Sequence, residues 1–276
     1  MPEIHPTAVV DRNARLADDV QIGPYTIIGP KVVIGRGTRI GSHCIIEGAT
    51  TIGQFNRIGH HVCLGQYPQD LKYRGEPATL EIGDHNDIRE NVTMHIGTEN
   101  GGGRTAVGSY NYIMVNAHVA HDCIVGDHTI LSNNVMLAGH IFVEDHAVLA
   151  GGAGVSHYVT IGRYAFVGGL SGVVHDCPPF LVCDGHPARV RTVNSIGLSR
   201  HKFDPQTIDN LKRAHRILFA RSGGNIAAAL EQVEAELGDD ENVRELLEFT
   251  RNRAAATNGR HAESLRRDDK RQTPTR

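Results

Sequence analysis

Aliphatic residues occupy every sixth position along most of this 276-residue chain. The positions form three runs: Ile4, Val10, Leu16, Ile22, Ile28, Ile34, Ile40, Ile46, Ile52, Ile58 and Leu64; then Ile82, Ile88 and Met94; then Val107, Ile113, Val119, Val125, Leu131, Leu137, Val143, Leu149, Val155, Ile161, Val167 and Val173. A helix would place apolar residues three and four positions apart, and a half-buried strand would alternate, so a period of six fits neither. We therefore predict a β-solenoid in which each hexad supplies a short strand and a corner, with the aliphatic side chain inward.

Glycine often follows the aliphatic residue, as at Gly23, Gly29, Gly35 and Gly41. We expect it to permit the backbone conformation of the corner. The pattern resembles that of the hexapeptide-repeat acyltransferases, in which three hexads form one coil of a left-handed parallel β-helix. That handedness comes from the resemblance, because the usual rule for parallel crossovers would give a right-handed coil. At three hexads per coil, the 26 hexads would make between eight and nine coils.

Two insertions interrupt the pattern, near residues 66–81 and 95–106. The first is too long for a simple corner and carries Asp70, Lys72, Tyr73 and Arg74, and loops of this length on a regular scaffold are often functional. The second begins at His95 and is rich in glycine. It fits a flexible lip, whereas a phosphate-binding loop would need a strand before it and a helix after it.

The six-residue pattern ends at Val173, and helical signals follow. Three helices are expected: one from Asp204-Pro205 to Gly223-Gly224, one from Asn225 to Gly238, and one around Val243, Leu246 and Leu247. We therefore predict a solenoid over residues 1–190, a small helical domain over 191–252 and a disordered basic tail over 253–276.

The C-terminal tail is basic, since residues 251–276 hold eight Lys or Arg against three Asp or Glu. It could attract an acidic carrier protein, although a solvated tail is the simpler interpretation.

Composition limits the classes of function. The formal net charge of −3 argues against nucleic acid as a partner, and no run of apolar residues is long enough for a membrane span. The N-terminus lacks a charged segment followed by an apolar one, so we expect a cytoplasmic protein. The five cysteines show no CxxC spacing, which predicts buried thiols rather than disulfides or a thiolate zinc site.

Two of the 17 histidines, His118 and His121, lie close together, with Asp122 beside the second. His121 stands two places after the inward Val119 and His118 directly before it, so the pair lies at different points around the coil. His157 shares the hexad place of His121 and follows it by two coils, which puts the two about 10 Å apart. Histidines so arranged would line a strip of surface that suits a long substrate.

Five motifs give the chain a more specific resemblance. They are QDLKY at 69–73, HVAHDC at 118–123, LAGH at 137–140, GGLSGV at 168–173 and NSIGLSR at 194–200. In this order they resemble the motifs of the UDP-N-acetylglucosamine O-acyltransferases, over essentially residues 1–250. The resemblance implies transfer of a 3-hydroxyacyl chain from acyl carrier protein to the sugar 3-hydroxyl of UDP-N-acetylglucosamine, the first step of lipid A synthesis. It also implies a homotrimer, and we expect neither a cofactor nor a metal.

The resemblance also assigns roles to residues. His121 would be the general base, a role that suits an imidazole, and Asp122 would orient it. Consecutive strand residues point to opposite faces, so this pair must lie at a corner. The backbone N–H of Gly139 would stabilise the oxyanion. Substrate contacts are implied for Asp70, Lys72, His95, His118, His140, His157, Asn194 and Arg200, and Gly169 matches the position that limits acyl length.

Some residues depart from the family's pattern. His157 stands where glutamine is common, Ser156 where histidine is usual, and Ile96 where arginine is frequent. Acylation of a 3-amino sugar on nitrogen therefore stays open. Two other classes of function also stay open: a trimeric zinc enzyme like the β-helical carbonic anhydrases, and a scaffold that only binds.

Seven histidines are expected to be structural or on the surface: His5, His43, His85, His128, His146, His175 and His215.

Overall fold

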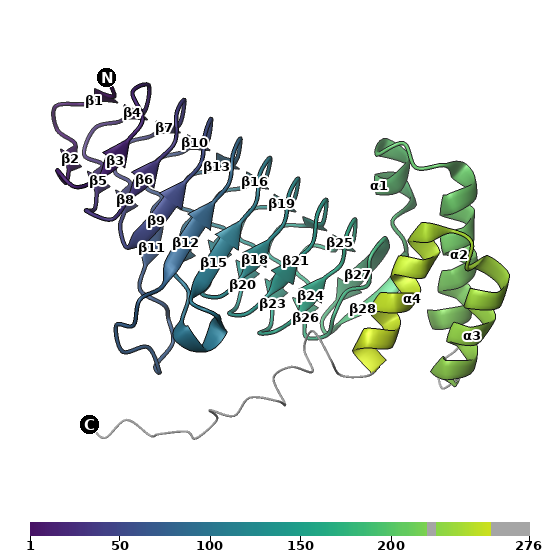
Figure 1. The fold of residues 1–276 in the computed structure, drawn as a ribbon. Helices are drawn as coiled ribbons and strands as arrows, with labels where there is room; N and C mark the ends of the chain where they lie inside the picture. The colour runs from purple at the N-terminus through teal and green to yellow at the C-terminus, as the bar shows by residue number, and fades with distance from the viewer. Residues whose placement is uncertain (220–224, 255–276) are drawn as a thin grey trace.

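The computed structural model describes residues 1–219 and 225–254, and in it the hexads wind into one long parallel β-helix (Figure 1). Its three faces are sheets A, B and C. Sheet A contains β1 (Glu3–Ile4), β4 (Gln21–Ile22), β7 (Arg39–Ile40), β10 (Arg57–Ile58), β13 (Asp87–Ile88), β16 (Tyr112–Ile113), β19 (Ile130–Leu131), β22 (Val148–Leu149), β25 (Phe166–Val167), β27 (Leu181–Gly185) and β28 (Ala188–Val193). Sheet B contains β2 (Val9–Val10), β5 (Ile27–Ile28), β8 (Ile45–Ile46), β11 (Cys63–Gln66), β14 (Thr93–His95), β17 (His118–Val119), β20 (Met136–Leu137), β23 (Gly154–Val155) and β26 (Gly172–Val173). Sheet C contains β3 (Arg15–Leu16), β6 (Val33–Ile34), β9 (Ala49–Ile52), β12 (Thr79–Ile82), β15 (Arg104–Val107), β18 (Ile124–Val125), β21 (Phe142–Val143) and β24 (Thr160–Ile161).

Strands that are neighbours in a sheet lie one coil apart, and their inward residues stand beside each other. On sheet B, Val119 pairs with Leu137 and Leu137 pairs with Val155, and all three side chains are buried. Ile4 is 40% exposed because the first coil is covered on one side only. Every aliphatic position of the pattern falls on one of the strands β1 to β26. The prediction of a solenoid of eight to nine coils is therefore confirmed.

The glycine after the inward residue has a different role from the expected one. A Cβ on Gly23 would lie 2.6 Å from the carbonyl oxygen of Gly41 in the next coil. The left-handed backbone conformation falls instead two residues later, on residues such as Tyr110 (φ 60°) and His128 (φ 56°). The close approach of successive coils, and not the corner, requires glycine at these positions.

One corner of the β-helix carries a continuous stack of aromatic rings. It comprises Phe55, His85, Tyr110, His128, His146 and Tyr164, with ring centroids 4.5 to 5.0 Å apart. At a second corner Tyr25, His43 and His61 stack at 5.0 Å. Ring contacts of this kind offset the cost of a left-handed conformation in residues other than glycine. His43, His85, His128 and His146 therefore stabilise corners, as the sequence analysis expected of them.

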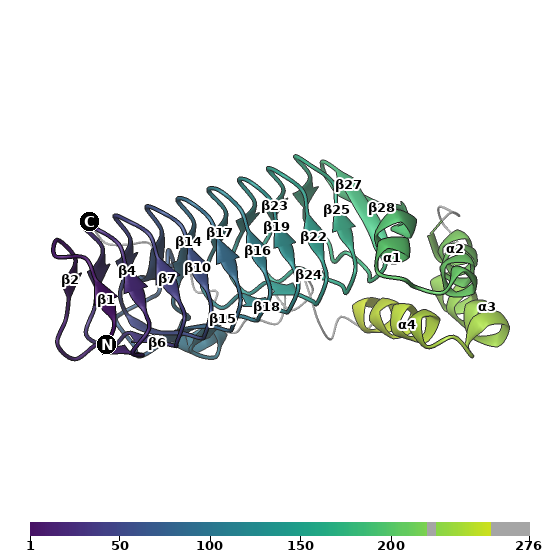
Figure 2. The ribbon, with the colours of Figure 1, turned by 90° about the horizontal axis from the view of Figure 1, so that it is seen from above.

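In the described part of the chain, the solenoid is followed by a hairpin and four helices. Strands β27 and β28 pair antiparallel and extend sheet A. The helices are α1 (Ser195–Arg200), α2 (Pro205–Phe219), α3 (Ile226–Leu237) and α4 (Glu241–Ala254), and they lie at the end of the solenoid opposite the N-terminal coil (Figures 1 and 2). Their core includes Phe180, Leu211, Val233 and Leu246. Helix α1 had not been expected, and the other three coincide with the expected helical signals.

The borders expected from sequence can be compared with these elements. The border between residues 190 and 191 falls inside β28, because the hairpin continues sheet A to Val193. The two insertions correspond to the connections β11–β12 and β14–β15, and the second contains the 3₁₀-helix η1 (Glu99–Gly101). The glycines at 223–224 and the tail beyond residue 254 lie outside the described residues. Within the described ranges, no helix is both long and apolar enough to cross a membrane.

We expect the Ile28→Ala variant to lose about 2–5 kcal/mol of unfolding free energy, because it removes a buried side chain from a continuous stack. Ile28 is 1% exposed, whereas its neighbour Ile27 on β5 is 39% exposed and faces outward. Ile27→Ala is therefore the matched control. Thermal unfolding followed by circular dichroism should show a much larger fall in midpoint for Ile28→Ala, and equal falls would contradict the inward stacking.

Candidate active site

A buried histidine–aspartate pair occupies the corner after β17. His121 Nδ1 lies 2.7 Å from Asp122 Oδ2, and the two residues are only 5% and 4% exposed. Asp122 adopts a left-handed conformation (φ 62°), so the chain bends sharply between the two side chains. This is the corner that the pair was expected to need. Because Nδ1 faces Asp122, Nε2 is the ring nitrogen left for another partner.

Gly139 lies in the same place one coil further on, against the His121 ring. A Cβ at Gly139 would lie 2.6 Å from His121 Cε1 and 2.8 Å from its Nε2. The residue two places after an inward residue does not donate its backbone N–H to a strand of the next coil. Proline, which has no N–H, occupies this place at Pro6, Pro24 and Pro30. Among the described residues, the Gly139 N–H donates to no other group. A backbone donor is therefore available beside His121.

Two further histidines, His118 and His95, lie beside the pair, and both have lowered pKa values that favour the neutral imidazole. His118 Nδ1 and Thr93 Oγ1 are hydrogen-bonded at 2.7 Å, and burial lowers the pKa of His118. His95 lies edge-on to His118, with the ring centroids 4.9 Å apart. Burial, and then the charges of His118 and His121, lower the pKa of His95 to about 4. Its Nδ1 finds no hydrogen-bond partner among the described residues.

His140 lies beside both members of the pair, with its ring edge-on to that of His121 and the centroids 5.1 Å apart. Its Nδ1 is 3.7 Å from Asp122 Oδ2, and its ring stacks on Tyr158 at 4.5 Å. His121, Asp122 and His140 each offer one ligand atom within 4.8 Å of the others, so this is the place in the described chain that could hold a metal ion. The donors are two imidazoles and one carboxylate, not the three converging imidazoles that the zinc alternative requires.

The first insertion contributes a charged pair. Lys72 Nζ lies 3.2 Å from Asp70 Oδ2, and the Lys72 N–H donates to Asp70 Oδ1 at 2.9 Å. Burial would raise the pKa of Asp70, but the hydrogen bonds from Lys72 and the nearby charge of His121 outweigh it and lower that pKa. Asp70 therefore stays ionised and can accept hydrogen bonds from a ligand.

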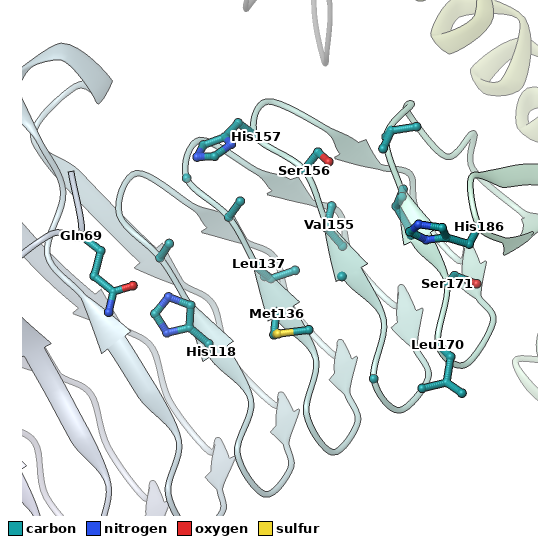
Figure 3. Close-up of a pocket in the computed structure, with 18 of the residues that line it drawn as sticks. Gln69, His118, Met136, Leu137, Val155, Ser156, His157, Leu170, Ser171 and His186 are labelled. Carbon is teal, nitrogen blue, oxygen red and sulfur yellow. The ribbon is translucent and has the colours of Figure 1, made fainter. Parts of the chain in front are cut away.

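A groove of about 600 Å³ runs from this cluster along sheet B (Figure 3). It starts at Gln69 and His118, crosses β20 and β23, and ends at β26 and the β27–β28 turn at His186. Part of its wall has no side chain, because Gly139, Gly152, Gly154 and Gly172 line it. Met136 and Leu170 supply apolar surface and are 53% and 82% exposed. The lining is polar around Gln69, His118 and His121, and beyond them it is mostly apolar or glycine, with single polar side chains at Ser156, His157, Ser171 and His186.

The groove separates the residues selected from sequence into two groups. His118, His121, Gly139 and His157 line it, whereas Asp70, Lys72, His95, Asp122, His140, Gly169, Asn194 and Arg200 do not. Gly169 precedes the lining residue Leu170. Asn194 caps α1, where its Oδ1 accepts from the Gly197 N–H at 3.1 Å and its Nδ2 donates to the Tyr164 carbonyl at 3.0 Å. Arg200 is the exposed last residue of α1.

Several lining residues had not been selected from sequence. Gln69 lies inside the QDLKY motif, while Met136 and His186 lie outside every motif. Met136 could have been found from its hexad place, since it precedes the inward Leu137 as His118 precedes Val119. Of the departing residues, Ser156 and His157 line the groove, whereas Ile96 is 5% exposed and packs in the solenoid core.

Comparisons with known proteins give the same family over both parts of the chain. Residues 176–259 match the family described as UDP-N-acetylglucosamine O-acyltransferase, domain 2, and residues 1–36 and 104–139 match bacterial transferase hexapeptide repeats. The acyl-[acyl-carrier-protein]–UDP-N-acetylglucosamine O-acyltransferase of Syntrophobacter fumaroxidans is 47% identical over 248 residues, which cover 90% of this chain and 96% of that protein. The protein of the same name from Thiobacillus denitrificans is 48% identical over 249 residues, with the same coverage of each chain.

Solved structures agree. LpxA from Acinetobacter baumannii superposes with a TM-score of 0.85 at 42% identity, covering 89% of this chain and 96% of that one. The UDP-N-acetylglucosamine acyltransferase from Bacteroides fragilis gives a TM-score of 0.87 at 36% identity, covering 90% and 96%. The expected left-handed parallel β-helix with a small C-terminal helical region is thereby confirmed.

We expect the His95 imidazole to remain neutral at pH 5.5, because its pKa is lowered to about 4. An unfolded chain would bind this proton near pH 6.5, so the contribution of His95 to stability falls as the pH drops from about 6.5 towards 4. Histidine NMR titration, with the His95→Asn variant to assign the resonance, measures the midpoint. A midpoint close to 6.5 would contradict the buried environment.

Proposed function

This chain belongs to the family of UDP-N-acetylglucosamine O-acyltransferases, and we propose that it transfers a 3-hydroxyacyl group from acyl carrier protein to the 3-hydroxyl of UDP-N-acetylglucosamine. This reaction is the first step of lipid A synthesis. The observation that carries the proposal is the buried His121–Asp122 pair beside Gly139, at the polar end of a long and largely apolar groove. The polar end suits the sugar and the apolar length suits the acyl chain.

In the proposed reaction His121 acts as general base. Its Nε2 takes the proton of the sugar 3-hydroxyl as that oxygen attacks the thioester carbonyl, and Asp122 stabilises the imidazolium through Nδ1. The new C–O bond forms first and the C–S bond then breaks. The thiolate of the carrier receives the proton from His121, so the base returns to its starting state.

The Gly139 N–H is the proposed donor to the oxyanion. The tetrahedral intermediate places its negative charge on the former carbonyl oxygen, and a backbone N–H beside the base can reach it. Any side chain at residue 139 would overlap the His121 ring. The absence of a side chain thus serves two purposes, since it lets the ring lie over the chain and leaves the donor accessible.

The remaining residues are proposed to bind the substrates. Asp70, Lys72, His95, His118 and His140 surround the base and would contact the nucleotide sugar, with His157 further along the groove. Gly169, next to Leu170, would limit acyl length. Asn194 and Arg200 lie outside the groove of their own chain, which fits contacts to a substrate bound at a neighbouring copy.

We therefore include a homotrimer in the proposal, with each groove between two solenoids. Exposed apolar side chains around the groove support it, since Tyr67, Leu71 and Leu170 are 75%, 85% and 82% exposed. Acyl carrier protein and UDP-N-acetylglucosamine are the two partners in this proposal. The compartment in this proposal is the cytoplasm.

The alternatives left open by the sequence are not adopted. The relatives compared above are named as O-acyltransferases of UDP-N-acetylglucosamine, not as enzymes that act on a 3-amino sugar. The zinc alternative is not adopted, because the relatives are named as O-acyltransferases and the possible ligand cluster in the described chain has two imidazoles rather than three, its third member being the carboxylate bonded to His121. A scaffold that only binds would not require a buried histidine–aspartate pair.

The His121→Ala variant should lower kcat by about 10² to 10⁴-fold, because it removes the general base. His128→Phe is the matched control, since it changes another corner histidine and keeps an aromatic ring in its stack. Transfer from 3-hydroxyacyl carrier protein to radiolabelled UDP-N-acetylglucosamine measures both. The wild-type enzyme should keep its transfer activity in the presence of a metal chelator. Loss of transfer on chelation would contradict the proposed metal-free mechanism.

The Gly139→Ala variant should lower kcat by about 10²-fold or more, because the added Cβ displaces His121 and crowds the proposed oxyanion donor. Gly151→Ala is the matched control. Gly151 has the same place in its hexad, and a Cβ there would meet nothing closer than the Asn133 carbonyl at 3.4 Å. Similar activities for the two variants in the same transfer assay would argue against both roles of Gly139.

A further inference from the structure

The glycine-rich second insertion closes over the carboxylate of Asp122, and we propose that Thr98 in this insertion is the positioning residue of the catalytic pair. Thr98 would hold Asp122 through two donors and so set the direction and strength of its bond to His121. The proposal rests on the proposed function, since it assigns a role within the same reaction.

Thr98 offers one donor to each oxygen of the carboxylate. Its N–H donates to Asp122 Oδ1 at 2.7 Å, and its Oγ1–H donates to Asp122 Oδ2 at 2.7 Å. Both residues are buried, with Thr98 3% and Asp122 4% exposed. Two donors from one residue fix the plane of the carboxylate. Oδ2, which also accepts from His121 Nδ1, is thereby aimed at the imidazole.

The rest of the insertion is shaped to bring Thr98 to this place. Thr98 is the N-cap of η1, and its Oγ1 accepts from the Gly101 N–H at 3.2 Å. A Cβ on Gly101 would lie 1.9 Å from Asp122 Cγ, so only glycine lets η1 approach the carboxylate. On the other side, the Asp122 N–H donates to Thr105 Oγ1 at 2.8 Å. The insertion is a cover packed on Asp122, not the flexible lip expected from its glycines.

The chemical effect of these bonds has a definite sign. A donor on Oδ2 withdraws negative charge from the oxygen that faces His121, and so it moderates how strongly Asp122 favours the imidazolium. Other ionisable groups also face the pair. They are His140 at 3.7 Å from Oδ2, His95 and His118, whose positive charge would oppose protonation of His121, and Asp70, whose negative charge favours it. These groups stay in place when only Thr98 is changed.

The test compares Thr98→Val with Thr98→Ser. Valine keeps the shape and the N–H but removes the hydroxyl donor, whereas serine restores it. We expect Thr98→Val to lower kcat about tenfold, with KM for UDP-N-acetylglucosamine changed less than twofold, and Thr98→Ser to recover most of kcat. Because Oδ2 then carries more negative charge, the acid limb of the pH profile of kcat/KM should move to higher pH in Thr98→Val. The titration midpoint of the His121 imidazole, followed by NMR, should move in the same direction.

Thr38→Val is the matched control for loss of a buried hydroxyl. Thr38 is also fully buried, and its Oγ1 donates to the Gly53 carbonyl at 2.9 Å, far along the chain from the pair. It should leave kcat and the pH profile as in the wild type. Circular dichroism checks that every variant is folded.

The possible outcomes separate the two proposals. If the wild type transfers acyl groups and Thr98→Val keeps its kcat and pH profile, the role of Thr98 is wrong and the function stands. A fall in kcat with no change in the acid limb of the pH profile or in the His121 titration would also overturn the role of Thr98. Such a result would mean that the substitution damages the site in general and does not act through His121. If the wild type transfers nothing, the proposed function fails, and the NMR titration alone then decides whether Thr98 controls His121.

Discussion

The in-register pairing of parallel strands around a column of aliphatic side chains is the constraint on which this molecule depends. Each coil adds one inward residue to each of three stacks, and Val119, Leu137 and Val155 show the regular step on sheet B. Residues one coil apart therefore occupy the same place around the axis. His121, Gly139 and His157 form such a series, so the position of His121 relative to the groove follows from how the core packs.

A buried charge is costly in such an apolar scaffold, and the insertions supply the groups that compensate for it. The carboxylate of Asp122 lies at a corner of the solenoid, outside its aliphatic interior, and is buried under the second insertion. A plain hexad has too few residues to cover it. The second insertion provides two donors from Thr98, and the first provides the Asp70–Lys72 pair nearby. The interruptions of the repeat thus supply polar partners to a pair of residues that the repeat itself positions.

The candidate site was predictable where it depended on the hexad register. The corner position of His121 and Asp122 follows from counting places after Val119, and the same counting separates His121, in the second place after an inward residue, from third-place histidines such as His128. Groups that meet through loops were not predictable in this way. Thr98 lies 24 residues from Asp122, and His186 reaches the groove from a hairpin turn, so neither shows any periodic signal. The role of Gly23 was also missed, because the approach of Gly41 in the next coil is a contact between coils.

The sequence by itself determined the solenoid, the number of coils, three of the four helices in the described residues and the placing of His121 and Asp122 at one corner. It could do so because a strict repeat turns position along the chain into position around the axis. Only the tertiary structure decided which residues line the groove, how the carboxylate of Asp122 is held, and that Asn194 and Arg200 lie outside the groove of their own chain. Those arrangements depend on the paths of loops, on the hairpin and on helix packing, where the repeat no longer applies and distant segments meet through their side chains.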